Sequence, residues 1–256
     1  MKKFLLGSVA LAAMIAGPAM AADMPLKAPP PPPVFSWTGC YVGIEGGYGW
    51  GQSKASYLGL FPVGGDLTPR FDVNGGLAGV EYGCNQQFGN FWVFGIEGDW
   101  SWTDKKGSSF DTGSIGIPTF QSTVHERWIS TSRARVGWAW NRSLLYVTGG
   151  FAAARVEAGV VVPVGFAFPG TYTDTHILYG WTVGAGFEYA FWNNLSFKAE
   201  YLYARFDTNN FFTVSPNPIA FANNRHVDLD NNIVRVGLNW RFTECVFGFP
   251  GGCSGP

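Results

Sequence analysis

The chain carries little charge, and it has no long apolar run after its first residues. Charged residues make up 14% of the 256, against about 25% in an ordinary soluble domain. No later segment stays apolar for the ~18 residues that a membrane helix requires. This combination favours a β protein that meets lipid at alternate positions, because each strand then carries its hydrophobicity on half of its residues. A soluble barrel or sandwich rich in glycine and aromatic residues is the alternative.

Motifs for chemistry are also scarce. The four cysteines form no C-x-x-C pair, which weakens a zinc or redox interpretation. The sequence has no Gly-x-Ser-x-Gly nucleophile elbow and no phosphate-binding loop ending in Lys-Ser or Lys-Thr. The near-balance of basic and acidic residues gives no electrostatic footprint for nucleic acid. The sequence also has no run of Lys or Arg that would suggest a polybasic membrane anchor. We therefore expect no enzyme, no catalytic residue, no bound metal and no cofactor.

The N-terminus predicts export. Residues 1–21 read as a signal peptide, with Lys2 and Lys3 before an apolar stretch and Ala19-Met20-Ala21 as the cleavage site. Removing these two lysines from the 17 basic residues leaves 15 bases against 18 acids, formally −3. Residues 22–37 read as a proline-rich periplasmic spacer, because the five prolines at 29–33 enforce an extended segment. A ligand for a proline-binding partner is the other interpretation of that segment.

From residue 38 onward the pattern predicts an all-β fold, an eight-stranded antiparallel up-and-down transmembrane β-barrel over 38–242. The expected strands are residues 39–52, 71–86, 91–103, 122–140, 144–156, 172–191, 195–207 and 227–242. Connections at 87–90, 141–143 and 192–194 are tight, whereas those at 53–70, 104–121, 157–171 and 208–226 are long. Short and long connections alternate, as in outer-membrane barrels, so both chain termini are expected on the short-turn, periplasmic side.

One face of each predicted strand is apolar, as in NNIVRVGLNWRF at 231–242, where Val234, Val236, Leu238, Trp240 and Phe242 alternate with polar residues. Aromatic residues gather at both ends of these faces and smaller apolar residues lie between, which matches the two interfacial girdles of a membrane barrel. The outer girdle holds Tyr48, Trp50, Trp100 and Trp102, and the inner one Trp92, Trp138, Trp140, Tyr189, Trp192 and Trp240.

The opposite faces hold glycines and charged residues, and we expect them to fill the lumen. An eight-stranded barrel has room for side chains only, so glycines with one long charged chain per strand fit better than aromatics from every strand. Buried charges also need partners, and six acids against five bases nearly supply them. The expected lumen charges are Glu45, Glu81, Glu97, Asp99, Arg133, Arg135, Glu188, Lys198, Glu200, Arg235 and Arg241. Glu97 and Asp99 resemble an acid pair, but we interpret them as partners of Arg133 and Arg135 on the next strand.

Several stretches together resemble a known family. They are an Ala-Asp start after the signal, a proline-rich lead, SWTGCYVG at 36–43, GIEGDWSW at 95–102 and a last strand ending in NWRF. The chain is similar to the small outer-membrane β-barrel porin family of alphaproteobacterial type, whose members are often described as immunogenic outer-membrane proteins. The resemblance implies an OmpA-like barrel whose terminal aromatic, here Phe242, is read by the barrel-insertion machinery. The tail at 243–256, which contains two cysteines, departs from that pattern.

The cysteines are candidates for disulfides, and the histidines are candidates for haem ligation. Cys40 and Cys84 lie on the outward faces of the first two strands, and a hairpin centred at residue 62 would oppose them, which permits a disulfide if the register holds. Cys245 and Cys253 would close a small loop in the tail. His125, His176 and His226 fall near outer strand ends. They are weak haem candidates, since some relatives of the family are reported to bind haemin, but solvated rim residues are the simpler interpretation.

The sequence thus predicts a structural, surface-exposed protein integral to the outer membrane, with termini periplasmic and long loops contacting the environment or a host. Its expected partners are outer-membrane lipid and lipopolysaccharide, the insertion machinery and external ligands at the loops, with no nucleic acid. Two alternatives stay open. One is a narrow porin that passes small solutes or ions, and the other is a haem- or lipid-binding surface receptor.

Overall fold

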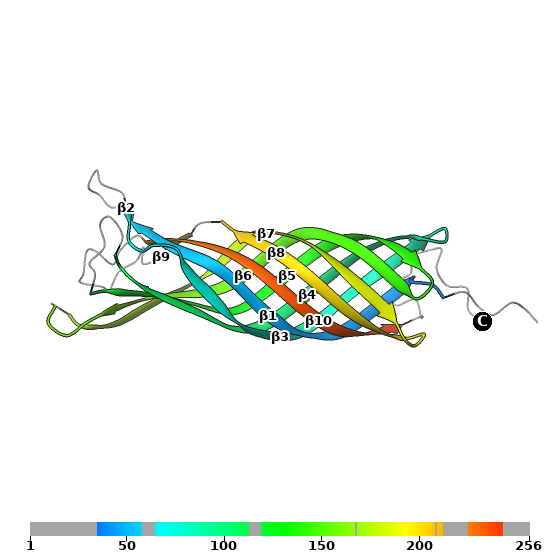
Figure 1. Cartoon of the computed structure of the whole chain (residues 1–256), viewed down its shortest axis with the longest axis horizontal. Helices are drawn as coiled ribbons and strands as arrows, with labels where there is room; N and C mark the ends of the chain where they lie inside the picture. Colours follow the sequence, from blue (N-terminus) through cyan, green and yellow to red (C-terminus); the bar gives the residue numbers. More distant parts are fainter. Residues whose placement is uncertain are drawn as a thin grey trace, which may run out of the picture. The chain divides into compact units, whose positions relative to one another are not determined.

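The strands form one antiparallel sheet that closes on itself (Figure 1). The computed structural model describes residues 35–57, 65–112, 119–166, 168–207, 209–211 and 225–242. The long strands are β1 (Gly39–Tyr57), β3 (Phe71–Phe88), β4 (Trp92–Phe110), β5 (Gln121–Trp140), β6 (Ser143–Val162), β7 (Gly170–Ala190), β8 (Leu195–Phe206) and β10 (Arg225–Phe242). Two short strands, β2 (Gly65–Asp66) and β9 (Asn209–Phe211), pair with the outer ends of β1 and β10. The predicted fold class is confirmed.

Closure comes from the pairing of the first and last long strands. β1 pairs with β10 from Cys40 opposite Phe242 to Tyr57 opposite Arg225, so neither strand is left as a free edge. Every other long strand pairs with its sequence neighbours. A closed sheet satisfies its backbone N–H and C=O groups internally, which is the condition for crossing a bilayer with strands. Among the described residues, no helix is long and apolar enough to cross a membrane.

The turns confirm the predicted alternation of short and long connections. The strands on either side of the β3–β4, β5–β6 and β7–β8 turns are separated by at most four residues. Asn141 in the β5–β6 turn has φ 54°, a left-handed conformation that asparagine tolerates. We call the end with these turns the inner end of the barrel. The four longer connections lie at the opposite end, the outer end.

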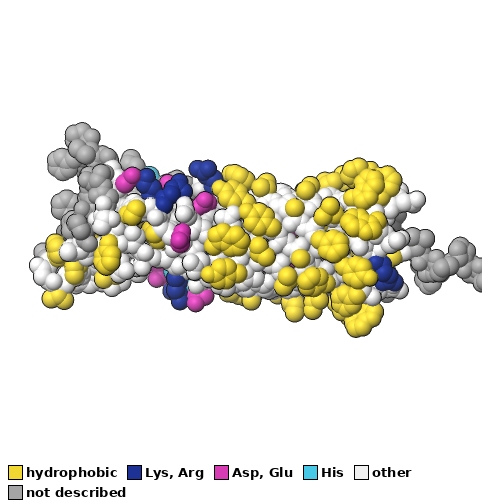
Figure 2. All heavy atoms as spheres, viewed as in Figure 1, with side chains coloured by type: hydrophobic (Ala, Val, Ile, Leu, Met, Phe, Trp, Pro, Cys, Tyr) yellow, Lys and Arg dark blue, Asp and Glu magenta, His cyan; other side chains and the backbone are white. Residues whose placement is uncertain are grey.

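The outward faces in the inner two-thirds of the barrel are apolar, as predicted. Ile44 and Val147 expose 63% and 62% of their surface, and the girdle residues are also exposed. Figure 2 shows this apolar belt at the right and centre of the molecule. Trp92 and Trp102 on β4 bound it, and ten residue steps correspond to about 34 Å along a strand. With a typical tilt of about 40°, the belt is about 25 Å tall, which matches a membrane barrel.

The strands are longer at the outer end than the sequence indicated. Residues 53–57, 104–110 and 157–162 were expected in loops, but they continue β1, β4 and β6. The sequence did not indicate these extensions, because apolar and polar residues exchange faces beyond the outer girdle. On β6, Arg155 and Glu157 lie outside while Val156 and Ala158 are buried inside. The outer third is therefore built like a water-soluble barrel, with a charged exterior that Figure 2 shows to the left of the apolar belt.

A disulfide joins β1 and β3 near the inner end. Cys40 and Cys84 are direct cross-strand partners in the register that was expected, and their sulfur atoms are bonded. The bond lies on the outward face, two residues before Val42 in the apolar belt. Cys245 and Cys253 lie outside the described residues, as do the whole predicted signal peptide and most of the predicted spacer.

Candidate functional site in the lumen

The inner mouth of the barrel is filled by the residues that precede β1. Trp37 is fully buried, and its backbone N–H donates to Gln87 Oε1 at 2.8 Å. The guanidinium of Arg241 lies 4.6 Å from the centroid of the Trp37 ring and 4.8 Å from that of Phe35. Its Nη1 also donates to the Ser36 carbonyl oxygen at 2.9 Å. Residues 35–37 were expected in the spacer, but Trp37 is buried in the inner mouth of the barrel as a plug, with the partly buried Phe35 beside it.

This plug has its own apolar core. Buried residues from the inner ends of β4, β5, β6 and β7 surround the indole of Trp37, and Phe35 packs against them. The members are Trp37, Val93, Ala139, Leu144, Tyr146 and Ala190. The lumen is thus closed by side chains before the charged zone begins.

Arg235 on β10 is the centre of the charged zone. Its guanidinium contacts Glu45 Oε1 at 2.6 Å, Asp99 Oδ2 at 3.0 Å and Glu200 Oε2 at 2.7 Å. These carboxylates come from β1, β4 and β8, so a single side chain connects four strands across the lumen. All of these groups are buried. In a low-dielectric interior such contacts are strong, and a missing partner is costly.

Arg133 and Arg135 on β5 extend the network. Arg133 contacts Asp99 and Glu200 at 3.0 Å each and Glu97 at 3.2 Å. Arg135 contacts Glu188 Oε2 at 3.2 Å and Glu97 Oε2 at 3.5 Å. The expected pairing of the two acids on β4 with the two arginines on β5 is therefore present in the structure.

Arg135 is also held by neutral groups. It donates from Nε to Asn85 Oδ1 at 2.8 Å and lies 5.0 Å and 4.9 Å from the ring centroids of Tyr41 and Tyr146. The two tyrosine hydroxyls donate to Glu97 and Glu200, at 3.1 Å each. These tyrosines were not predicted as lumen residues, although strand alternation places both on the charged face.

Lys198 on β8 completes the set. It forms an ion pair with Glu81 and lies 3.7 Å from Glu200 Oε2 and 4.0 Å from Glu97 Oε2. The structure thus brings together ten of the eleven expected lumen charges, and Arg241 is the exception. Arg241 is directed to the plug, so four bases face six acids in the network. Serine and threonine hydroxyls supply additional donors, as in the 2.6 Å bond from Ser101 to Glu45.

Glycines on the inward face leave room for these large side chains. A Cβ at Gly186 would collide with the ring of Tyr146, and one at Gly83 would collide with the ring of Tyr41. Small residues on one strand therefore accommodate long residues on its neighbours, as the volume argument required.

The outer part of the lumen contains a separate ion pair beneath an apolar core. Lys105 Nζ lies 2.8 Å from Glu126 Oε1, and both side chains are fully buried. Asn231 donates to the other oxygen of Glu126 at 2.6 Å. Beyond them, inward-facing apolar residues from β3, β5, β6, β7, β8 and β10 pack together, among them Val73, Val156 and Leu229. This outer core was not predicted, because most of its residues lie on the strand faces that were expected to hold glycines and charged residues, and only Phe120, Ala158, Val160, Val162 and Phe211 fell in segments expected to be loops.

The three histidines do not converge. His176 faces inward at the outer mouth, 3.0 Å from Asp174 Oδ2, and its ring meets Phe211 edge-on at 5.0 Å. His125 alternates with the buried Val124 and Glu126, so it lies on the outer face, 3.3 Å from Asp104. His226 likewise alternates with the inward Val227 and faces outward. Among the described residues, no cluster of His, Cys, Asp and Glu has the arrangement of a metal site.

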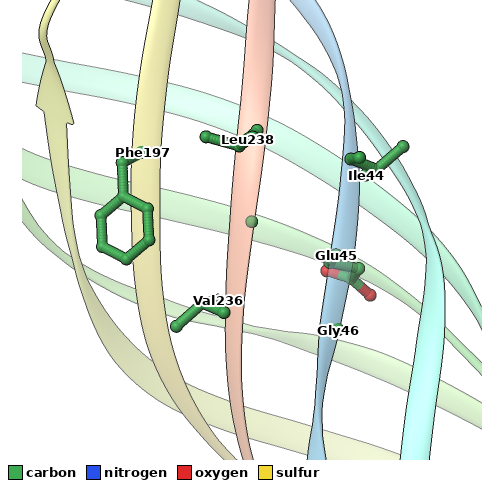
Figure 3. A pocket seen from close by; sticks show the side chains of 7 residues that line it. Ile44, Glu45, Gly46, Phe197, Val236 and Leu238 are labelled. Carbon is green, nitrogen blue, oxygen red and sulfur yellow. The ribbon is translucent and has the colours of Figure 1, made fainter.

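The surface depression drawn in Figure 3 lies on the lipid-facing wall. It crosses β8, β10 and β1, where Gly46 leaves a gap among Ile44, Phe197, Val236 and Leu238. The large side chains around it belong to the apolar belt. The depression is therefore in contact with acyl chains and offers no polar group for chemistry, since the nearby Glu45 is directed into the lumen toward Arg235.

A closed barrel with an apolar belt about 25 Å tall, two aromatic girdles and an ionic lumen defines an integral β-barrel protein of the bacterial outer membrane. Comparison with known proteins agrees: residues 9–242 match the family model described as outer membrane protein beta-barrel domain, and the chain belongs to this family. The protein is accordingly located in the outer membrane. Its inner end faces the periplasm and its outer end faces the exterior.

Two relatives and one solved structure illustrate the similarity. The 31 kDa outer-membrane immunogenic protein of Brucella melitensis is 36% identical over 251 residues, which cover 94% of this chain and 100% of that protein. The 22 kDa outer membrane protein of Rhizobium leguminosarum bv. viciae is 28% identical over 213 residues, covering 83% and 82%. The outer membrane protein OprG from Pseudomonas aeruginosa has a TM-score of 0.51 at 13% identity, covering 81% of this chain and 99% of that one, and it supports the fold alone.

Proposed function

We propose that this protein is a closed, non-conducting barrel whose role is structural and surface-directed. The observation that carries the proposal is the occupied lumen. From the inner to the outer end it contains the Trp37 plug, the ionic network centred on Arg235 and the apolar core that includes Val156. Its contacts with lipid and lipopolysaccharide follow from the apolar belt and the charged band above it. Its outer end is the part that meets external molecules.

A narrow porin is the competing function, and the network argues against it. A solute would have to separate Arg235 from three carboxylates, and leaving any of these charges unpaired in the lumen costs several kcal/mol. Proteoliposome swelling in a small neutral sugar tests the point. We expect the same swelling rate as for empty liposomes, and a rate that rises with the amount of inserted protein would favour the porin.

A haem receptor is the other alternative, and the histidine geometry argues against it. Two histidines that ligate one haem iron must approach it from opposite faces, but His176 lies inside the wall while His125 and His226 lie outside it. Titration of haemin into wild type and into a variant that lacks all three histidines tests the idea. We expect wild type and variant to bind haemin with equal affinity. A loss of tight haemin binding in the variant would favour the haem-receptor function.

We also propose that the protein is not an enzyme. The pair His176–Asp174 at the outer mouth resembles part of a catalytic dyad. Its histidine is, however, packed against Phe211, and the adjoining buried residues are apolar. Incubation of the folded protein with a mixed peptide library is expected to leave the peptides intact, and cleavage that a His176→Ala variant abolishes would contradict the proposal.

A further inference from the structure

Among the residues that the structure describes, the hairpin of β6 and β7 extends farthest from the membrane belt, and its end is apolar. β6 and β7 contain 20 and 21 residues, and the turn between them lies at the far left of Figure 1. Val164, Phe166 and Phe168 in this turn expose 94%, 40% and 55% of their surface, and we call them the hairpin tip. The 16 residues from Ala158 to Thr173 include no charged residue. Isolated exposed apolar residues are ordinary, but a contiguous group suggests an interaction site.

The protein's own membrane does not explain this group. Glu157 is the last outward charge on β6, and seven residue steps separate it from Val164, which is about 23 Å along a strand. The charged exterior band, which includes Lys106, Arg127 and Glu157, lies between the tip and the apolar belt (Figure 2). The tip therefore stands outside the bilayer in which the barrel is inserted.

Phe166 and Phe168 make contacts within the hairpin and with a neighbouring segment. The Tyr172 hydroxyl donates to the Phe168 carbonyl oxygen at 3.0 Å. The ring of Phe166 meets that of Phe120 edge-on at 5.1 Å. Phe168 has φ 64°, a left-handed conformation that bulky residues rarely adopt. A surface ordered in advance loses less conformational entropy when it binds.

We propose that the hairpin tip inserts into the interfacial region of a second lipid bilayer apposed to the cell surface. Three side chains offer at most a few hundred Å², well below the roughly 800 Å² per partner of a stable protein interface. Insertion into a bilayer requires only apolar side chains and no shape complementarity. The uncharged stretch on both sides of the tip means that no ionised group has to be desolvated. This activity adds to the structural role and does not depend on whether the lumen conducts.

Flotation with lipid vesicles tests the proposal. The full-length protein, folded in nanodiscs, is mixed with uncharged phosphatidylcholine vesicles, and the share that floats with them gives a partition coefficient. The double variant Val164→Ser/Phe168→Ser is expected to lower this coefficient at least tenfold, which corresponds to about 1.4 kcal/mol. Val164→Trp is expected to raise it. Phe110→Ser is the matched control, because Phe110 is similarly exposed at the outer end of β4 but lies outside the hairpin, and it should change nothing.

Three results of the flotation assay would overturn the proposal. They are an absence of flotation by the wild type, equal flotation of the wild type and the double variant, and flotation that requires anionic lipid. The last would assign binding to the charged band. Capture of a protein partner through the tip, without vesicle binding, would also reject a bilayer as the occupant. Heat-modifiable gel migration of each variant shows beforehand that the barrel is folded, so failure of the tip is separable from failure of the barrel.

Discussion

Replacing Arg235 with methionine should destabilise the barrel more than any exposed substitution of the same kind. The change keeps much of the aliphatic volume and removes the cation that contacts Glu45, Asp99 and Glu200. Breaking a buried ion pair by deleting one partner costs about 3–5 kcal/mol, because the remaining charge stays buried without compensation. With a urea dependence of about 2 kcal/mol per molar, the unfolding midpoint should fall by roughly 1.5–2.5 M.

The assay is urea unfolding of the barrel in lipid vesicles, followed by tryptophan fluorescence and by heat-modifiable gel migration. Arg127→Met is the matched control. Arg127 pairs with Glu157 at 2.9 Å but exposes about half of its side chain (49%), so its loss should cost about 1 kcal/mol or less. Equal midpoints for the two variants would refute the reasoning, since the lumen network would then contribute no more than a surface pair.

Two further changes test other parts of the structure. Cys40→Ser/Cys84→Ser removes a link between residues 44 positions apart, and the chain-entropy relation gives a loss of about 4 kcal/mol; a urea midpoint unchanged from the oxidised wild type would argue against this. Lys105→Met should destabilise the barrel by about 3–5 kcal/mol, because it leaves the Glu126 carboxylate buried without its cation. Lys105→Met/Glu126→Leu should recover most of this loss, because an apolar pair can replace a buried ion pair. A double variant as unstable as the single one in the same unfolding assay would contradict that account.

Much of the fold was predictable because inward and outward residues alternate along the strands, apart from irregularities between Trp102 and Lys105 and between Glu126 and Trp128. Val136 and Arg135 sit on adjacent positions of β5, and one meets lipid while the other meets carboxylates. Once the apolar face is assigned to lipid, the inward orientation of the charged residues in the network around Arg235 follows. The disulfide followed in the same way, because the hairpin register makes Cys40 and Cys84 direct partners.

The remaining features depend on contacts that alternation does not encode. Trp37 precedes the first strand, so nothing in its local pattern shows that it folds back beneath Arg241. The same contact explains why Arg241 does not join the ionic network, although its position in the alternation of β10 placed it on the lumen face. The outer strand ends were missed because apolar and polar positions exchange faces beyond Trp102. The alternation continues on β6, but there the outward residue Arg155 is charged and the inward residue Val156 is apolar.

Single-channel recording in planar bilayers tests the sealed lumen most directly. We expect the folded wild-type protein to insert without conductance steps at any applied voltage. We expect Arg133→Ala/Arg135→Ala to introduce ion-conducting steps, because it empties the middle of the lumen. Steady open channels in the wild type, with a conductance that these substitutions leave unchanged, would contradict it.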